Sequence, residues 1–127
     1  MKSWACAAAA VVAGLASTQA FAQAGNAARG ERVFNQQCKT CHSLEKDDSS
    51  ITGPTLHGLF GTKAGAAPGF QFSEAMKKSG IVWDETTLAE YTRDPQAKVP
   101  DTKMVFNGIK QPGQLADLVA YLKQAAQ

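Results

Sequence analysis

The segment Cys38-Lys39-Thr40-Cys41-His42 constrains this chain more than any other feature, because it gathers two thiols and an imidazole at adjacent positions. Two cysteines three positions apart, followed at once by a histidine, form the C-x-x-C-H pattern of covalent haem attachment. Each thiol can add to one of the two vinyl groups of the haem, and the next residue then presents its imidazole to the iron. We therefore expect one haem, held by Cys38 and Cys41.

Two other uses of a C-x-x-C pair fit the sequence less well. A redox thiol pair normally follows a buried strand and opens a helix, whose N-terminus lowers the thiol pKa. Here the pair ends a predicted helix instead. A zinc site needs four nitrogen or sulfur ligands, and the chain beyond residue 22 offers only Cys38, Cys41, His42 and His57, with no second paired cluster.

The first two dozen residues differ in composition from the rest. A single lysine precedes an apolar run from Trp4 to Leu15, which is followed by polar residues and by Ala20-Phe21-Ala22. This pattern predicts a secretory signal peptide over 1–22, cleaved after Ala22, and one domain over 23–127. An uncleaved membrane anchor is the alternative, but the apolar run is shorter than the roughly 20 residues that span a bilayer.

Export to the periplasm agrees with the cysteine count. In an oxidising compartment, paired thiols are used in disulfides or for covalent cofactors. Cys6 would leave with the signal peptide, so that Cys38 and Cys41 must share one purpose. Losing Lys2 lowers the 13 basic side chains to 12 against 11 acidic ones, a net charge of +1. That balance argues against a nucleic-acid partner.

Capping residues predict three helices in the first two thirds of the domain. Asn26 is a suitable N-cap for a helix over about 27–38. Ser73 can cap a short helix that runs through Lys78, and Asp84 can cap another that stops at Asp94-Pro95.

The clearest amphipathic pattern predicts the last helix. After Pro112, four apolar residues follow helical spacing, namely Leu115, Leu118, Val119 and Leu122. This helix should close the core against the first one. No stretch alternates at period two, so the predicted fold is all-α.

Two long segments without helical periodicity separate the predicted helices. The first runs over 43–69 and is rich in glycine, proline, aspartate and serine, and the second runs over 100–108. Loops of the first length are unusual in a compact domain unless they surround something functional. A haem would supply that function.

The iron of an electron carrier needs a second axial ligand, usually Met or His. The chain beyond residue 22 offers Met76, Met104 and His57. Met76 lies in a predicted short helix, where a place in the core is more usual, and His57 lies in a Gly-rich loop soon after His42. Met104 lies in the late loop, which lets the C-terminal half fold over the opposite face of the haem. We therefore predict His42 and Met104 as the metal ligands.

With these residues in place, the chain resembles class I cytochromes c, the group of mitochondrial cytochrome c and its soluble bacterial counterparts. The resemblance runs from about Gly30 to Leu122, and its marks are the segments 38–42, 53–61, 67–70, 80–83, 100–106 and 117–122. It implies crossing N- and C-terminal helices, with short middle helices and Ω-type loops around the haem. The crossing would involve Gly30, Phe34, Leu118 and Tyr121.

The resemblance also implies roles for the residues near the haem. Met104 would be the axial sulfur ligand, and the Pro54 carbonyl would accept a hydrogen bond from the second nitrogen of His42, orienting the ring. Tyr91 would place its hydroxyl near the Met104 sulfur. Trp83 and Thr102 would hydrogen-bond a haem propionate.

Four positions depart from the pattern of the family. Thr62 stands where a propionate-binding arginine is common, and Phe72 where a tyrosine often donates to a propionate. Met76 replaces a frequent asparagine, and Asp101 a usual glycine. A less cationic propionate pocket should lower the reduction potential, because nearby positive charge favours the reduced iron.

The implied function is one-electron transfer between redox proteins. With imidazole and sulfur on both axial sites, the iron has no open position for a substrate, so neither catalytic residues nor enzyme activity are expected. The implied partners are a membrane quinol:cytochrome c reductase and a terminal oxidase or photosynthetic reaction centre, which a monomer would meet transiently at the membrane surface. The alternatives are a haem enzyme, a peroxidase or small-molecule reductase with labile Met104, and a fixed electron-transfer subunit of a larger complex.

Carriers of this family dock through lysines that surround the exposed haem edge. The basic residues available for such a ring are Arg32, Lys39, Lys63, Lys103 and Lys110. The ring would be thinned by Gln36, Gln37, Gln96, Ala97 and Gln111. Ordinary solubilising charge is the other interpretation of these residues.

Overall fold

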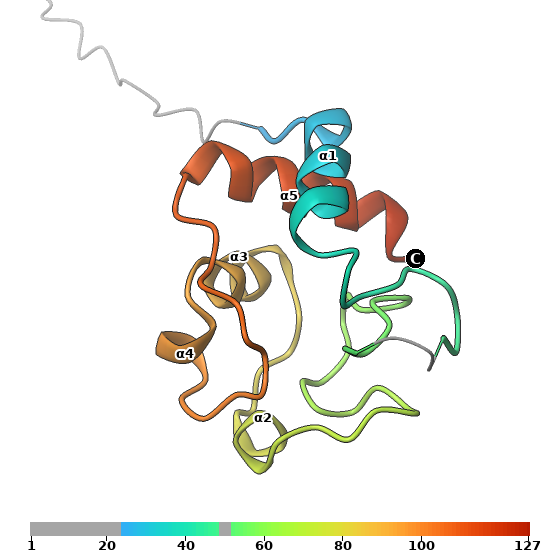
Figure 1. The fold of residues 1–127 in the computed structure, drawn as a ribbon, viewed down its shortest axis with the longest axis vertical. Coiled ribbons are helices and arrows are strands. Elements are labelled where there is room, and N and C mark those ends of the chain that lie inside the picture. Colours follow the sequence, from blue (N-terminus) through green and yellow to red (C-terminus); the bar gives the residue numbers. More distant parts are fainter. Residues whose placement is uncertain (1–23, 49–51) are drawn as a thin grey trace, which may run out of the picture.

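The computed structural model describes residues 24–48 and 52–127, which form helices joined by long loops (Figure 1). The helices in these ranges are α1 (Ala27–Gln37), α2 (Glu74–Lys78), α3 (Glu85–Arg93), α4 (Pro95–Lys98) and α5 (Pro112–Ala125). One isolated antiparallel bridge, between Lys63 and Val82, is the only β-type pairing in them. The all-α prediction is therefore confirmed, whereas the predicted signal peptide lies outside the described residues.

Helices α1 and α5 come from opposite ends of the described chain and cross each other (Figure 1). Gly30 allows the close approach, because a Cβ at this position would lie 1.9 Å from the Asp117 carbonyl oxygen. The rings of Phe34 and Tyr121 pack with their centroids 5.7 Å apart, and Leu118 is only 1% exposed. The predicted crossing of the terminal helices is confirmed with the residues expected for it.

A buried carboxylate fastens the start of α1 to α5. Asp117 accepts hydrogen bonds from Arg29 Nε at 2.7 Å and from Arg29 Nη2 at 3.0 Å. It also accepts one from the Asn26 backbone N–H at 2.6 Å. The Arg29 bonds, and then the Asn26 bond, hold the pKa of Asp117 below its usual value. Asn26 caps α1 in turn, since its side chain accepts from the Arg29 backbone N–H.

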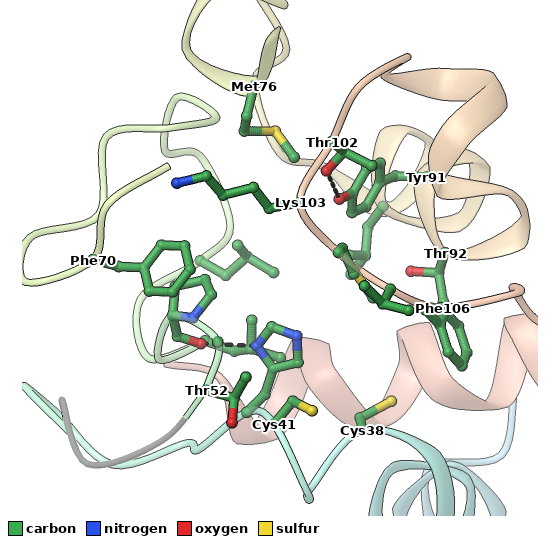
Figure 2. Close-up of a pocket in the computed structure, with 18 of the residues that line it drawn as sticks. Cys38, Cys41, Thr52, Phe70, Met76, Tyr91, Thr92, Thr102, Lys103 and Phe106 are labelled. Carbon is green, nitrogen blue, oxygen red and sulfur yellow. Dashed lines mark hydrogen bonds between the residues drawn. The ribbon is translucent and has the colours of Figure 1, made fainter. Parts of the chain in front are cut away.

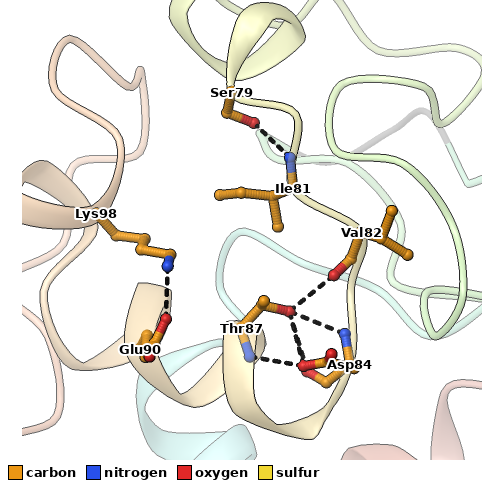
Figure 3. A network of polar contacts seen from close by, with 7 residues as sticks. All are labelled: Ser79, Ile81, Val82, Asp84, Thr87, Glu90 and Lys98. Carbon is orange, nitrogen blue, oxygen red and sulfur yellow. Dashed lines mark hydrogen bonds and ion pairs between the residues drawn. The ribbon is translucent and has the colours of Figure 1, made fainter.

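The predicted caps of the short helices are confirmed. Ser73 accepts from the Met76 backbone N–H at the start of α2. At the start of α3, Asp84 and Thr87 form a capping box, in which each side chain accepts from the other residue's backbone N–H (Figure 3). The Thr87 hydroxyl also donates to the Val82 carbonyl at 2.9 Å, which ties the chain before α3 to the helix.

Helix α4 was not predicted. The prediction that Asp94-Pro95 stops a helix is correct for α3, which ends at Arg93. However, Pro95 is also the first residue of α4, and the Asp94 side chain accepts from the Ala97 N–H at 3.2 Å. Proline favours this position because its fixed φ suits a first turn and its missing N–H is not needed there. A helix of four residues is too short to show a hydrophobic period.

The long loops are held by backbone hydrogen bonds to segments distant in sequence. Gly61 donates to the Trp83 carbonyl and Ala64 to the Ile81 carbonyl, both at 2.8 Å. The late loop, residues 99–111, lies between α4 and α5. No helix in the described ranges has both the length and the apolar character needed to cross a bilayer.

Candidate cofactor site

A cavity of about 350 Å³ lies between the end of α1, α5 and the loops (Figure 2). Its volume falls within the range of roughly 300–1,000 Å³ that small-molecule and cofactor sites occupy. The walls are mainly apolar and include Leu56, Leu59, Phe70, Phe72, Leu118 and Leu122. The site therefore suits a large apolar group more than a small hydrophilic substrate.

Both cysteines of the C-x-x-C-H segment line this cavity (Figure 2). Cys38 is the C-cap of α1, so the pair follows a helix as predicted, and both thiols are free. Burial, and to a lesser extent Cys41, raises the pKa of Cys38 to about 11. A redox thiol pair needs a lowered pKa, so this environment argues against thiol–disulfide exchange.

His42 lines the same cavity, and its ring is held from one side. Its Nδ1–H donates to the Pro54 carbonyl oxygen at 2.8 Å, which is the bond that the resemblance implies. Gly53 lies against the ring so closely that a Cβ there would be 2.7 Å from His42 Cε1. Burial lowers the pKa of His42, although the Pro54 bond opposes this shift. The imidazole is thus favoured in its neutral form, which ligates metals through the remaining nitrogen.

Two thioethers line the cavity, and the spare histidine does not. Met104 is half-buried, and Met76 is buried at 6% exposure as expected of a core residue. His57 is exposed and lies outside the large cavity, on the wall of a smaller one. Of the three candidates for a second axial ligand, His57 is therefore the poorest.

Tyr91 and Thr102 lie side by side on the wall of the large cavity (Figure 2). Their hydroxyls share a hydrogen bond of 2.7 Å. The polar partner of the Tyr91 hydroxyl is thus Thr102, and the proximity of this hydroxyl to the Met104 sulfur, which the resemblance implies, stays a prediction. The bond satisfies two buried polar groups with each other, which lets the wall remain otherwise apolar.

Trp83 is the one predicted cofactor-binding residue that does not line the large cavity. It lines the smaller cavity of about 200 Å³ together with Thr62 and Lys63, and its ring packs on Tyr91 with centroids 5.3 Å apart. The other predicted residues all line the large cavity: Cys38, Cys41, His42, Pro54, Tyr91, Thr102 and Met104. The two cavities share wall residues, including Pro54 and Phe72.

One face of α3 contributes Tyr91, which the sequence analysis named, and two wall residues that it did not name, Leu88 and Thr92. Leu88, Tyr91 and Thr92 all line the cavity and are all buried. Their spacing of three and four residues places them on the same helical face. This spacing is visible in the sequence and would have identified the face once Tyr91 was assigned to the site.

The donor atoms on the cavity wall fit a covalently attached haem. They comprise two unpaired thiols, an oriented imidazole and two thioethers, set in an apolar enclosure. Zinc fits less well, because the described ranges contain no group of three or more His, Cys, Asp and Glu side chains able to hold a metal ion.

Comparisons with known proteins give one consistent result. Residues 27–126 match the family model described as cytochrome c. The chain is 50% identical over 109 residues to a cytochrome c of Chlamydomonas reinhardtii, covering 86% of this chain and 97% of the relative. It is 49% identical over 110 residues to cytochrome c2 of Blastochloris viridis, covering 87% of this chain and 86% of the relative. The structure of cytochrome cH from Methylobacterium extorquens is similar with a TM-score of 0.71 and 51% identity, covering 78% of this chain and 98% of that one.

Proposed function

The chain belongs to the cytochrome c family of haem-binding electron-transport proteins, and from this premise we propose that it is a soluble periplasmic carrier of single electrons, with His42 and Met104 as axial ligands of one haem c. Cys38 and Cys41 hold that haem covalently. The observation that carries the proposal is the convergence of the thiols, the imidazole and the Met104 thioether on one apolar cavity.

In this proposal Pro54, His42 and the apolar walls each have a task. Haem, when bound, supplies the one-electron change between ferric and ferrous iron. Pro54 orients the His42 ring and increases the donor strength of its free nitrogen. The apolar walls exclude water, which limits the solvent rearrangement that accompanies a change of charge. With His42 and Met104 both holding the iron, no position on it would remain for a substrate, which is why we propose a carrier and not an enzyme.

The absorption spectrum of the oxidised, haem-loaded protein tests the ligand assignment. We expect the sulfur-to-iron band near the red end of the spectrum, and we expect Met104→Leu to abolish it. Met76→Leu is the matched control, because it removes the other thioether of the same cavity and should leave the band in place. Loss of the band only in Met76→Leu would show that Met76, and not Met104, is the sulfur ligand. A high-spin spectrum in the unmodified protein would favour a haem enzyme with an open site.

The proposed partners are redox proteins, namely a quinol:cytochrome c reductase as donor and a terminal oxidase or photosynthetic reaction centre as acceptor. Arg32, Lys39 and Lys103 are exposed and can take part in docking. Lys110 is exposed as well, but its ammonium group also contacts Asp94 at 3.3 Å, which reduces its net positive field. Docking by charge should therefore be weak and sensitive to salt.

Rates of electron transfer to an oxidase with an acidic surface test this docking. We expect the rate to fall as the ionic strength rises, because salt screens exposed charges. A rate independent of ionic strength would remove the docking proposal and leave the charges as solubilising groups. Co-purification with a membrane complex at high salt would instead indicate a fixed subunit.

The mass of the exported protein tests the proposed cleavage after Ala22.

A further inference from the structure

The late loop that carries Met104 has few backbone anchors of its own. The Thr102 N–H donates to the Val99 carbonyl, and the Ile109 N–H donates to the Thr92 carbonyl, both at 3.0 Å. Between these two points, residues 103–108 make no backbone-to-backbone hydrogen bond within the described chain. Thr102 is therefore the residue nearest to Met104 that a backbone-to-backbone hydrogen bond anchors.

Two side chains hold Thr102 from the helices beside it. The Tyr91 hydroxyl binds the Thr102 hydroxyl at 2.7 Å. Gln96, in the single turn of α4, donates from Nε2 to the Thr102 carbonyl oxygen at 3.1 Å. The Gln96 bond is the only side-chain bond to the loop backbone at Thr102 in the described ranges, and it fixes the peptide that leads into Lys103 and Met104.

The loop needs such anchors, because its entry is conformationally unfavourable. Asp101, directly before Thr102, has a φ of +67°, in the left-handed region that residues other than glycine rarely adopt. On the far side, the Lys103 ammonium donates to the Gln71 carbonyl at 3.0 Å, and this bond is exposed to solvent. Without its anchors the segment around Met104 would relax toward other backbone conformations.

We infer that Gln96 is a positioning residue that keeps the Met104 sulfur on the cavity wall by holding the Thr102 carbonyl. This inference rests on the proposed function, in which Met104 is an axial ligand. Gln96 acts through the backbone and touches neither the ligand atom nor the haem. Its amide favours the conformation in which the Met104 sulfur lies on the cavity wall, which we call closed. An external ligand can bind the iron only in the open conformation, in which this sulfur has moved away.

Competition by imidazole measures this bias directly. Imidazole binds ferric haem only when the Met104 sulfur has left, so that its apparent dissociation constant contains the fraction of molecules with an open loop. A hydrogen bond contributes a net 0.5–1.5 kcal/mol or so. We therefore expect Gln96→Ala to tighten the apparent binding of imidazole about two- to tenfold, measured by visible absorption of the haem-loaded protein.

A second variant at the same position makes the test specific for the donor. Gln96→Glu has nearly the shape of glutamine but no N–H donor when ionised, and it places an acceptor opposite the Thr102 carbonyl. We expect imidazole to bind at least as tightly as in Gln96→Ala. Gln111→Glu makes the same charge change at an exposed residue whose side chain does not cap α5, and imidazole affinity should remain that of the unmodified protein.

Another control separates release of the loop from general loss of stability. Asn26→Ala removes the cap of α1 on the far side of the helix crossing and should lower the free energy of unfolding without changing imidazole affinity. Equal affinity in the unmodified protein, Gln96→Ala and Gln96→Glu would overturn the role of Gln96, and so would an equal gain in Asn26→Ala. If the oxidised, unmodified protein has no sulfur-to-iron band, the proposed ligation by Met104 is wrong, and the role of Gln96 that rests on it is wrong as well.

Discussion

Different contacts hold two regions of the molecule in place: the crossing of α1 and α5, and the late loop, residues 99–111. At the crossing, the backbones touch because Gly30 has no Cβ, and Asp117 and Arg29 pair across the interface. In the late loop, residues 103–108 make no backbone-to-backbone hydrogen bond within the described chain, and Met104 and Phe106 face a cavity. The crossing is held by direct contacts between the two helices, whereas the late loop has few backbone anchors and lines the cavity.

This difference separates two kinds of mutational effect. Substitutions of Gly30 and Asp117, which lie at the crossing but do not line the cavity, should change the free energy of unfolding and leave the iron environment as it was. Substitutions in the late loop and its anchors should change the iron environment, with a smaller effect on global unfolding. The predictions below test that separation.

The largest effect should follow from preventing haem attachment with the double variant Cys38→Ala/Cys41→Ala. Without haem, the apolar walls of a cavity of about 350 Å³ would face water. Because a domain is only marginally stable, losing this burial should remove most of its stability. We expect amide hydrogen exchange to become fast throughout residues 99–111, with weak protection at most in α1 and α5. Slow exchange across the late loop would show that it folds without the haem.

The next largest effect should come from Gly30→Ala at the crossing. The new Cβ would meet the Asp117 carbonyl oxygen at 1.9 Å, so one of the two helices must move. Overpacking of this kind costs about 3 kcal/mol, measurable by denaturant unfolding. Gly113→Ala, also in a helix but with nothing within 4 Å of its Cβ, should be neutral or stabilise by up to about 1 kcal/mol. A sulfur-to-iron band weakened in Gly30→Ala would contradict the separation of the two regions.

A smaller effect, dependent on pH, should come from Asp117→Asn. The pKa of Asp117 is lower in the folded state than in the unfolded one, so its charge stabilises the protein fully above the unfolded value of about 3.8. That contribution is lost as the pH falls through the lowered folded pKa. The unmodified protein should thus be more stable than Asp117→Asn at pH 7, with the difference disappearing in acid. A difference that persists unchanged into acid would assign the effect to packing instead of charge.

The smallest effect should be a shift of the reduction potential in Thr62→Arg. Thr62 is exposed and lines the smaller cavity, which shares Pro54 and Phe72 with the wall of the large one. A positive charge there favours the reduced iron, and an interaction of about 1 kcal/mol moves a one-electron potential by about 40 mV. We expect voltammetry to show a rise of tens of millivolts with little change in unfolding free energy. An unchanged or lower potential would contradict the importance of the missing arginine.

Signals that act within a few residues could be predicted from the sequence. Asn26, Ser73 and Asp84 cap the helices that follow them, because a short polar side chain meets free backbone N–H groups at that place. The C-x-x-C-H segment indicated the cofactor for the same reason, since its spacing alone sets the chemistry. Seven of the eight predicted cofactor-binding residues line one cavity.

Features that depend on distant contacts could not be predicted. Asp117 pairs with Arg29 across 88 positions, and no local pattern distinguishes it from a solvent-exposed aspartate. Gln96 looks like an ordinary surface residue until α4 places it beside the carbonyl of Thr102. Trp83 lines the neighbouring cavity, and its hydrogen bond to a haem propionate stays a prediction.

The contact between α1 and α5 also determines how the chain can fold. It joins segments separated by the 74 residues between Gln37 and Pro112 and so closes most of the domain into one ring. Closing a flexible ring of this length costs about 4 kcal/mol of chain entropy. Neither helix alone makes contacts that offset this cost. The contacts of the crossing must therefore form together. Breaking the contacts of Gly30, Phe34, Asp117, Leu118 and Tyr121 at the crossing would therefore open the whole ring.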